Sequence, residues 1–448
     1  MSFFKAYDMR GTFGVDFDLD TVYKVGLSLP EIVGGKKWLV GRDGRTTSKD
    51  IRDALVSALV EAGAQVVDVG LSTTSMVYFF TAEDSFDGSV MITASHNPPS
   101  DNGMKVSRRS ALPVGYSDGL DKVEKAVSQS TAQRPASVPQ VESCHDEALR
   151  RYLAWHKSRL PDLKNLRFAV DCSNGMSSLL ARELFPGALI LNDTIDGNFS
   201  SHSPNPLKAE ARAALAEAVR TNHLDCGVIF DGDADRAMFV DEFGNFVQSD
   251  YLIPVVARAT ARALGKKSGI VIHDVRTSLG AVETLREDGF EPVMVPVGHA
   301  FAKPALRNSQ AICGGELAGH YYFSEFFSCD SGILAATRIL GEVARAKAEG
   351  SSFSQMMRPI LTRYANSGEM NFEVIDKDAA IERVLNECRD FGEEISRSEI
   401  DGVRIDFDKG WVSVRKSNTE PYLRLIVECR SAGLLDDWCE RLSRAVKG

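Results

Sequence analysis

One pattern occurs three times along the chain, and it constrains the fold more than any other feature of the sequence. Each copy begins with an apolar run that ends in polar residues, and these runs occupy residues 38–43, 168–173 and 270–275. A helix-like stretch and two further β-rich runs belong to every copy, at 65–69 and 90–93, at 189–191 and 227–230, and at 292–295 and 311–313. Alternating strands and helices are typical of parallel sheets that helices cover on both faces. The repeat therefore predicts three similar mixed α/β domains with largely parallel sheets.

The C-terminal part of the chain lacks this pattern. A helix-like run at 381–391 precedes a predicted hairpin, whose strands at 402–408 and 411–415 meet at a turn that contains glycine. A strand at 423–428 and a helix at 434–446 follow, so a small α+β domain is predicted. The length of 448 residues suits two to four domains. The expected domains are residues 1–150, 151–251, 252–362 and 363–448, with 363–370 as the connection to the last one.

Composition and charge exclude several classes of protein. The net charge of −10 argues against a nucleic-acid-binding surface, although a few arginines and backbone N–H groups could still hold a small anion. No apolar stretch approaches the roughly 20 residues of a membrane span, and the N-terminal residues lack the apolar core of a signal peptide. The eight cysteines form no CxxC pair, which favours reduced thiols. We therefore expect a cytoplasmic protein without nucleic-acid or membrane partners.

The third apolar run of each copy ends in a loop with unusual polar residues. In the first, which we call the serine loop (residues 94–101), Ser95 and His96 precede several turn-forming residues. Open α/β sheets place their ligand sites at such strand ends, but a turn serine that bonds to its own backbone is the simpler interpretation. The acidic loop (residues 231–236) and the Glu316 loop (residues 314–320) occupy the equivalent positions. We expect the three loops to converge on one cleft.

The acidic loop carries Asp231, Asp233 and Asp235 at alternate positions, so a tight turn could direct all three carboxylates at one hard cation. A solvated acidic turn is the alternative, which three acids directly after a buried strand disfavour. An EF-hand is rejected because Arg236 occupies its glycine position and β-type residues follow instead of a helix. Mg²⁺ is favoured, since it commonly combines few carboxylates with phosphate oxygens of a substrate.

Several other segments carry groups that could bind a ligand. Residues 415–421 combine a cation, two hydroxyls, an amide and loop N–H groups, with Arg424 close behind; this is typical of a phosphate site, and a polar surface turn is the alternative. His299 and Lys303 follow a predicted strand end, where a lone histidine is more often structural than catalytic. Glu316 lies among glycines, and a ligand contact and a structural role are equally open. For residues 41–45, structural salt bridging is at least as plausible as ligand binding.

Taken together, these loops resemble the α-D-phosphohexomutase superfamily, and most closely its bacterial phosphomannomutase and phosphoglucomutase branch. The resemblance covers nearly the whole chain. The matching segments, in order, are residues 4–11, the serine loop through Lys105, the acidic loop, Gly298 with His299, the Glu316 loop, and residues 417–421. One departure is Ala318, where many relatives carry serine, so one contact to a sugar hydroxyl is absent or moved. Such a hydrogen bond is worth roughly 0.5–1.5 kcal/mol, and its loss could soften sugar discrimination.

The resemblance implies four domains around a central cleft and a role for each candidate residue. Ser95 in the first domain would be the phosphorylated serine, and its phosphate together with Asp231, Asp233 and Asp235 of the second would bind Mg²⁺. Tyr7, Arg10, Lys105 and Arg236 would line the phosphotransfer site, with Lys105 and His299 at positions of proton transfer or substrate contact. Glu316 of the third domain would hold sugar hydroxyls. Further substrate contacts would come from Arg276, Gly298, His299, Lys303, Arg415, Ser417, Asn418, Thr419 and Arg424, of which residues 415–419 would grip the phosphate that is not transferred.

The activity that the resemblance implies is a phosphomannomutase. It would interconvert mannose 6-phosphate and mannose 1-phosphate through a phosphoserine enzyme and a hexose 1,6-bisphosphate, with Mg²⁺ as cofactor and the bisphosphate as both intermediate and activator. The alternatives are a phosphoglucomutase or dual-specificity enzyme, a phosphoglucosamine mutase, a metal-dependent sugar phosphatase, and a phosphosugar-binding protein without turnover. The expected partner is a small phosphosugar, and the expected assembly is a monomer or a homodimer.

Overall fold

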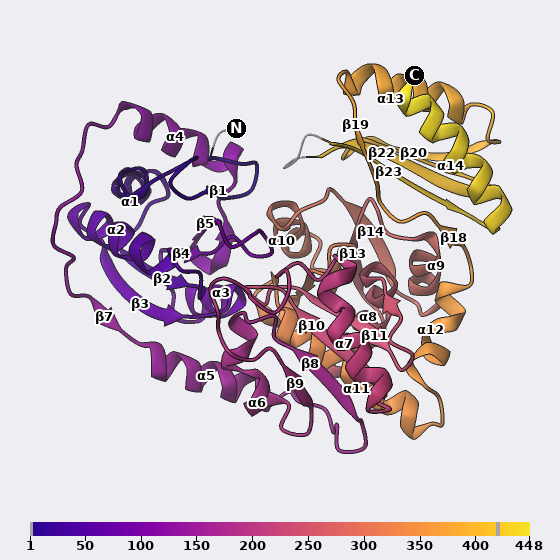
Figure 1. Ribbon diagram of the computed structural model, residues 1–448, viewed down its shortest axis with the longest axis horizontal. Coiled ribbons are helices and arrows are strands. Elements are labelled where there is room, and N and C mark those ends of the chain that lie inside the picture. The colour runs from indigo at the N-terminus through magenta and orange to yellow at the C-terminus, as the bar shows by residue number, and fades with distance from the viewer. Residues whose placement is uncertain (1–2, 418–421) are drawn as a thin grey trace.

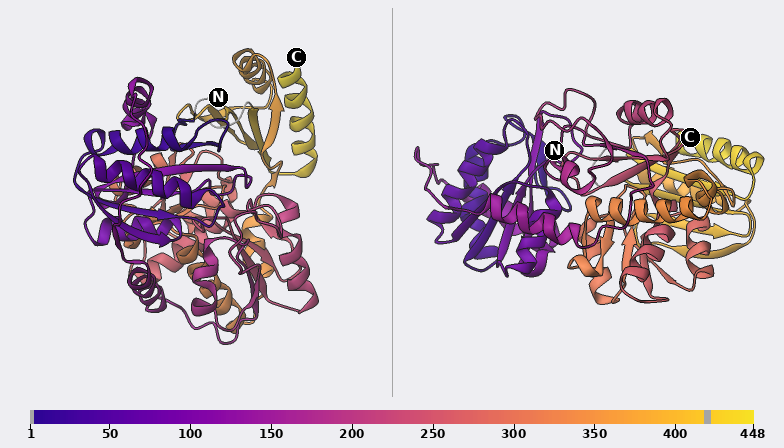
Figure 2. Two further views of the ribbon diagram at one scale, coloured as in Figure 1. Left: turned by 60° about the vertical axis from the view of Figure 1, so that its left-hand side comes forward. Right: turned by 90° about the horizontal axis from the view of Figure 1, so that it is seen from below.

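The computed structural model of the chain describes residues 3–417 and 422–448. Four sheets with their helices form four domains that follow one another along the chain. In Figure 1, domain I lies at the left, domains II and III occupy the lower centre and right, and domain IV lies at the upper right. The two further views place domain IV beside domain III, at the far end of the molecule from the helices of domain I (Figure 2). The predicted fold class, three α/β domains followed by an α+β domain, is confirmed.

Domain I is built on a mixed sheet. In sheet order its strands are β1 (Met9–Thr12), β5 (Asp101–Arg108), β4 (Gly88–Ile92), β2 (Lys37–Arg42), β3 (Gln65–Leu71) and β7 (Glu142–Ser143), with β6 (Leu112–Pro113) beside β5. Its helices are α1 (Leu19–Ile32), α2 (Ser48–Glu61), α3 (Thr74–Glu83) and α4 (Leu120–Gln129). Trp38 and Val40 of β2 pack with α1 and α2, whereas Leu39 packs with α3. Both faces of the central strand are therefore buried, as its uninterrupted apolar run predicts.

Domains II and III repeat this arrangement with fewer strands. The sheet of domain II runs β12 (Phe246–Val247), β11 (Ala237–Asp241), β10 (Cys226–Phe230), β8 (Phe168–Asp171) and β9 (Leu189–Leu191), with helices α6 (Ala181–Leu184) and α7 (Ala209–Thr221). That of domain III runs β14 (Glu291–Val295), β13 (Ile270–Asp274), β15 (Cys313–Gly315), β16 (Tyr321–Phe323) and β17 (Cys329–Asp330), with α8 (Ile253–Ala263), α9 (Leu279–Glu287), α10 (His299–Asn308), α11 (Gly332–Ala348) and α12 (Phe353–Leu361). Helix α5 (His145–Lys157) joins domain I to domain II.

The third strand of domain III differs from the prediction. We expected it over residues 311–313 and the loop from Gly314 onward, but β15 includes both Gly314 and Gly315. A β-carbon on Gly314 would lie 2.1 Å from the side chain of Ile272 on the neighbouring β13. The strand therefore needs glycine where it passes this close to its neighbour. Because glycine has no apolar side chain, these two residues did not extend the apolar run from which the strand was predicted.

Domain IV has an antiparallel sheet with two helices on one face. Its strands in order are β18 (Ala365–Asn366), β23 (Tyr422–Cys429), β22 (Gly410–Lys416), β21 (Val403–Phe407) and β20 (Glu394–Ser398), with β19 (Met370–Glu373) also beside β23, and its helices are α13 (Lys377–Cys388) and α14 (Ala432–Lys447). Part of the expected connection at 363–370 is thus strand, because β18 and the start of β19 pair with β23. No helix in the described ranges is both long and apolar enough to cross a bilayer.

Domain IV docks on domain III through its other sheet face. Trp411 and Ile426 of this face pack against Leu317 of the Glu316 loop. The buried Glu428 carboxylate accepts the Trp411 indole N–H (2.9 Å) and the backbone N–H of Leu279 in domain III (2.8 Å). These contacts fix where the end of β22, and with it Arg415, lies relative to the Glu316 loop.

Candidate active site

The structure brings the three predicted loops together where domains I, II and III meet. The Ser95 hydroxyl donates a hydrogen bond to Asp231 (Oγ–Oδ2 2.7 Å), which joins the serine loop to the acidic loop. Arg236, at the end of the acidic loop, forms an isolated β-bridge with His320, at the end of the Glu316 loop. Loops from three domains therefore face one another.

Ser95 lies on a strained backbone that its neighbours hold in place. Its φ is 51°, in the left-handed region, which costs a residue with a β-carbon roughly 1–2 kcal/mol. The Thr93 hydroxyl accepts the Ser95 amide (2.9 Å), and the Arg45 guanidinium donates to the Ser95 carbonyl (2.9 Å). Both backbone groups of Ser95 are occupied, and its hydroxyl is directed at the acidic loop. Strain held in this way is concentrated at functional sites.

The three aspartates of the acidic loop form a buried group suited to a divalent cation. One oxygen from each carboxylate lies within 4.8 Å of the other two. The Oδ1 atoms of Asp233 and Asp235 are buried and have no hydrogen-bond partner among the described residues. Burial and the neighbouring carboxylates of Asp235 and Asp233 raise the pKa of Asp231 well above its usual range. Oxygen ligands crowded in this way fit Mg²⁺, which takes few carboxylates and completes its shell with other oxygens.

Lys105 on β5 supplies the nearest cation. Its ammonium lies 2.7 Å from Asp233 Oδ2 and 2.6 Å from Asp235 Oδ2. Burial would lower the pKa of Lys105, but the two carboxylates outweigh burial and raise it. The pKa of Asp233 is lowered because the Lys105 ammonium outweighs the opposite effect of burial. Lys105 is therefore a charged ammonium in direct contact with two carboxylates of the acidic loop.

Domain I adds two further groups around the serine loop. Arg10 on β1 donates to the side chain of Asn97 (Nη1–Oδ1 3.0 Å) and pairs with Asp8. Thr74 at the start of α3 donates from its hydroxyl to Asp233 and from its backbone N–H to the Asp233 carbonyl. Thr74 was not among the predicted residues, because nothing in its local sequence distinguishes it from an ordinary helix start.

Tyr7 lies where domain I meets domain III. Its hydroxyl donates to the carbonyl of Val297 (3.0 Å), and a β-carbon on Gly298 would lie 3.0 Å from its ring. The ring is 6.1 Å from that of His299, whose Nδ1 is buried without a hydrogen-bond partner among the described residues. Residues 4–7 of domain I, Phe301 of domain III and Asp401 of domain IV line a cavity of about 530 Å³ at this junction. Tyr7, Gly298 and His299 thus lie together, as a shared substrate site requires.

Glu316 and His320 connect the third loop to the other two. Glu316 is buried and accepts the Tyr322 hydroxyl (2.7 Å) and the Gly298 N–H (3.3 Å). His320, which the sequence reasoning missed, lies 3.0 Å from the Nε of Arg236 and 2.9 Å from Asp330. The only local signal for His320 was its position directly after a glycine at the start of a strand. Its partners Arg236 and Asp330 lie on other elements, so the sequence around His320 does not indicate them.

Lys303 takes a position different from that of a solvent-facing substrate contact. It is fully buried, and its ammonium pairs with Asp330 (2.9 Å) and lies 3.4 Å from the centre of the Tyr78 ring. The Asp330 carboxylate also pairs with His320, so Asp330 connects Lys303 to the end of the Glu316 loop. Its direct contact with a substrate stays a prediction.

Three of the predicted arginines surround one acid. The Glu369 carboxylate lies 3.5 Å from Arg276 of domain III and 3.2 Å and 2.7 Å from Arg415 and Arg424 of domain IV. Glu369 was not predicted, because it lies in the segment that we took for a connection. Ser417 ends the described part of this loop, and Asn418 and Thr419 lie outside the described residues. The clustering of guanidinium groups is that of an anion site.

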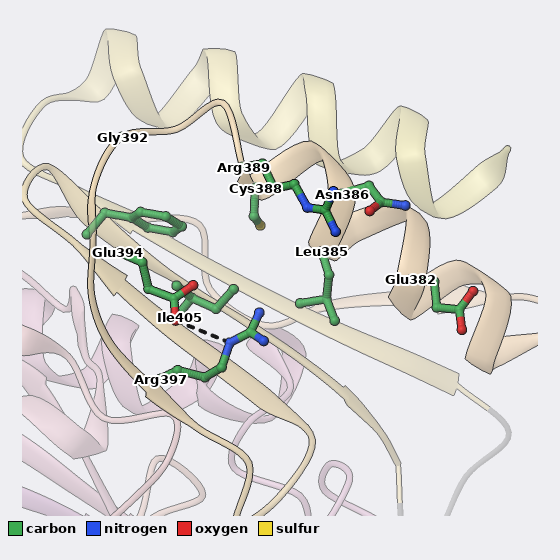
Figure 3. A pocket seen from close by; sticks show the side chains of 10 residues that line it. Glu382, Leu385, Asn386, Cys388, Arg389, Gly392, Glu394, Arg397 and Ile405 are labelled. Carbon is green, nitrogen blue, oxygen red and sulfur yellow. Dashed lines mark ion pairs between the residues drawn. The ribbon is translucent and has the colours of Figure 1, made fainter.

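Another cavity lies away from these loops. It has a volume of about 650 Å³ and lies within domain IV, between α13 and the edge of the sheet. Figure 3 shows Leu385 and Cys388 of α13 facing Glu394 and Arg397 of β20, which form an ion pair. None of the predicted site residues lines this cavity.

Four family models match the chain in sequence order. They are described as phosphoglucomutase/phosphomannomutase α/β/α domain I, domain II, domain III and C-terminal domain, and match residues 1–134, 150–244, 248–364 and 369–445. These ranges contain the serine loop, the acidic loop, the Glu316 loop and residues 415–421, respectively.

Individual relatives cover the chain over nearly its full length. Curated phosphohexose mutases of Xanthomonas campestris are 35% identical over 99% of both chains. A phosphomannomutase of Vibrio cholerae is 33% identical over 99% of this chain and 98% of its own. The crystal structure of a phosphoglucomutase/phosphomannomutase family protein from Burkholderia thailandensis has a TM-score of 0.85 at 27% identity and covers 99% of this chain and 97% of that one.

Proposed function

Because the chain belongs to the phosphoglucomutase/phosphomannomutase family of isomerases, we propose that it interconverts mannose 6-phosphate and mannose 1-phosphate. The observation that carries the proposal is the buried Ser95 hydroxyl, which lies 2.7 Å from Asp231 of the acidic loop, the loop whose other two carboxylates pair with Lys105. The relative from Vibrio cholerae that bears the name phosphomannomutase supports the choice of sugar.

In the proposed reaction Ser95 carries the phosphoryl group between two positions of the sugar. A bond forms between the phosphorus and the sugar 1-hydroxyl oxygen while the bond between phosphorus and Ser95 Oγ breaks, and the product is a hexose 1,6-bisphosphate. The proton of the 1-hydroxyl passes to a base on the protein, and Ser95 Oγ takes up a proton as it leaves the phosphorus. After the bisphosphate turns over, its 6-phosphate is transferred to Ser95 in the same way. The resulting 1-phosphate leaves, and the phosphorylated enzyme is restored.

Residues around Ser95 would stabilise the charge of the transferred group. The Lys105 ammonium and the guanidinium groups of Arg10 and Arg236 are the cations of this site. Asp231, Asp233 and Asp235 would hold Mg²⁺, which when bound supplies further positive charge beside the phosphoryl oxygens. Of the two candidate bases, Lys105 is held as a charged ammonium by Asp233 and Asp235 and has no free electron pair to accept a proton, which leaves the imidazole of His299 as the better candidate.

The arginines around Glu369 would bind the phosphate that is not transferred. Arg415 and Arg424 lie on adjacent strands of domain IV, and Arg276 reaches them from domain III. Both phosphates of the intermediate would have to occupy this site in turn. The site holds guanidinium groups, which recognise the phosphate and not the sugar, and this suits a substrate that binds in two orientations.

A dual-specificity enzyme that also accepts glucose phosphates is the second candidate. Ala318 stands in the Glu316 loop where a hydroxyl would otherwise face the sugar, and the Xanthomonas relatives carry the broader name phosphohexose mutases. A site with one fewer hydroxyl contact distinguishes epimers less strongly.

The decisive experiment compares turnover of mannose, glucose and glucosamine 1-phosphates side by side, with Mg²⁺ and a trace of hexose 1,6-bisphosphate. We expect the highest kcat/KM for mannose 1-phosphate and phosphate on the Ser95 peptide by mass spectrometry. Ser95→Ala should lose turnover, whereas Ser100→Ala, on the exposed side of the same loop, should retain it. Full turnover by Ser95→Ala, or inorganic phosphate release without isomerised sugar, would overturn the proposal, the latter in favour of a sugar phosphatase.

A further inference from the structure

Arg45 lies between β2 and α2 and is completely surrounded by hydrogen-bond acceptors. Its Nε donates to Asp43 (3.1 Å), its Nη1 to the carbonyls of Pro98 (2.6 Å) and Asp101 (3.0 Å), and its Nη2 to those of Ser95 (2.9 Å) and Asn97 (2.8 Å). All five N–H donors of the guanidinium are therefore used. Four of the five acceptors are backbone carbonyls of the serine loop.

The anchor of this side chain is itself held on domain I. Asp43 accepts the backbone N–H of Arg45 (3.0 Å) and the hydroxyl of Ser48 (2.5 Å) with its other oxygen. The guanidinium is thus fixed to the end of β2 on one side and gathers the serine loop on the other. A lysine could not replace it, because an ammonium has three donors and no planar fork.

Arg45 also lies against domain II. The Phe199 ring lies 4.9 Å from the guanidinium carbon, and the same ring would lie 3.2 Å from a β-carbon on Gly232 of the acidic loop. A β-carbon on Gly232 would also lie 2.6 Å from the Ser95 carbonyl oxygen that Arg45 binds. The guanidinium, the serine loop and the acidic loop therefore form one packed unit.

We propose that Arg45 is a positioning residue for phosphoryl transfer. It holds the carbonyl of Ser95 while Thr93 holds the amide, so that the residue keeps its left-handed backbone and its Oγ stays directed at the three aspartates. The inference rests on the proposed function, since it takes Ser95 as the phosphoryl carrier. Arg45 makes and breaks no bond in the reaction, and its own charge is matched by Asp43.

The test uses Arg45→Lys in the full-length protein, with Arg42→Lys as the matched control. Arg42 is the last residue of β2, and among its described hydrogen bonds its side chain donates only to the Asp43 carbonyl and to no carbonyl of the serine loop. For Arg45→Lys we expect kcat to fall by about 100-fold with the KM for the sugar phosphate changed less than about threefold. For Arg42→Lys we expect both constants to stay at the wild-type values.

Two further measurements separate positioning from general damage to the fold. Guanidinium chloride at millimolar concentration should restore part of the kcat of Arg45→Ala, whereas methylammonium should not, because only the planar ion can bridge the vacated carbonyls. If Arg45→Lys and Arg45→Ala fail to fold, Asp43→Asn, which weakens the anchor alone, should show the same selective loss of kcat to a smaller degree. Wild-type kcat in folded Arg45→Lys, or equal losses in kcat and in substrate affinity without rescue by guanidinium, would overturn the proposal.

Hydrogen exchange distinguishes this inference from the proposed function. The amides of residues 95–101 should exchange faster in Arg45→Lys than in the wild type without any substrate present. Wild-type protein that never acquires phosphate on Ser95 refutes the proposed function even if this exchange result holds. Unchanged exchange in a variant that is phosphorylated at the wild-type rate refutes the role of Arg45 alone.

Discussion

The serine loop and the acidic loop are in such close contact at Gly232 that this position has no room for a side chain. The Ser95 carbonyl approaches Gly232 so closely that a β-carbon there would lie 2.6 Å away. The nearby Gly175 faces Gly232 in the same way, with a β-carbon 2.6 Å from the Gly232 carbonyl. Contacts this short leave no room for even one methyl group, so the two loops depend on glycine at both positions.

Gly232→Ala should displace the serine loop from the acidic loop. We expect kcat to fall at least tenfold and the free energy of unfolding to drop by roughly 1–3 kcal/mol, because the methyl group overpacks a closed contact. Gly187→Ala is the control, since a β-carbon there would meet nothing within 4 Å. Steady-state kinetics and urea unfolding of both variants check the prediction, which fails if the two variants behave alike.

Ala318 should influence the preference between mannose and glucose phosphates, because it stands where many relatives carry serine. Ala318→Ser would return a hydroxyl to the Glu316 loop, and one hydrogen bond to a neutral hydroxyl is worth roughly 0.5–1.5 kcal/mol. We therefore expect the ratio of kcat/KM between mannose and glucose 1-phosphates to shift by about two- to tenfold. Parallel measurement of both substrates tests this, and an unchanged ratio would show that Ala318 does not face the sugar hydroxyls.

Helix α5 contains a buried histidine, His156, whose burial destabilises the fold at low pH. His156 is fully buried among Tyr152, Trp155 and Phe326, with ring centres 4.6, 5.0 and 6.3 Å away. Neither of its ring nitrogens has a hydrogen-bond partner among the described residues. Burial, and secondarily the cations Arg159 and Arg338, lower the pKa of His156 to about 3. The folded protein therefore holds this imidazole neutral.

His156 should make the protein sensitive to acid. Its pKa is about 3 in the fold and about 6.5 in the unfolded chain, so between these values only the unfolded chain binds the proton. The free energy of unfolding then decreases as pH falls from 6.5 toward 3, by up to roughly 4–5 kcal/mol. His156→Phe should abolish this contribution and raise stability at pH 5.

Urea unfolding between pH 4.5 and 8 measures the effect of His156. The control is His223→Asn, because His223 is exposed and has a left-handed backbone that asparagine tolerates. It should keep the acid dependence of the wild type. An equally steep loss of stability in His156→Phe would mean that other groups cause the acid sensitivity.

Across the whole molecule, the domains are less separate than the repeat implies. One apolar core runs through the interior of three domains and includes Leu39 of β2, Val170 of β8 and Val271 of β13. Domain IV has its own core around Trp438 and Leu442 of α14. Domains I to III should therefore behave as one unit, while domain IV depends on its docking contacts to stay in place.

Glu428→Ala should loosen domain IV. The substitution leaves the Trp411 indole N–H, the Leu279 N–H and the Asn366 amide without their acceptor in a buried interface, at a cost of roughly 1–3 kcal/mol for each unpaired group. We expect a separate, earlier unfolding transition of domain IV by calorimetry and a raised KM for the sugar phosphate, because Arg415 moves with this domain.

The matched control for domain IV is Glu440→Ala. Glu440 lies on the exposed face of α14 and pairs only with Arg444 among the described ion pairs, and such surface pairs contribute little. A single unfolding transition and an unchanged KM in Glu428→Ala would show that the Glu428 contacts do not control docking.

The sequence was sufficient for the fold class and for the loops on which the chemistry was expected. Apolar runs such as residues 38–40 and 168–170 report burial on both faces of a strand, and the order of strands and helices then limits the topology. Ser95 and the three aspartates stood out in the sequence because they directly follow buried strands. Burying a polar or charged group costs free energy unless it is hydrogen-bonded, paired with a charge or bound to a metal, so such groups point to a site. These are local properties, so they can be read along the chain.

Only the tertiary structure revealed the residues that hold those loops. Arg45 was as well explained by local salt bridging, and His320, Thr74 and Glu369 were not predicted. Arg45 binds carbonyls of residues 95–101 and Glu369 lies between arginines of two domains, so their partners are far away in sequence. Burial of a charge is tolerable only where acceptors gather around it, and that condition depends on how the domains pack rather than on any neighbouring residue.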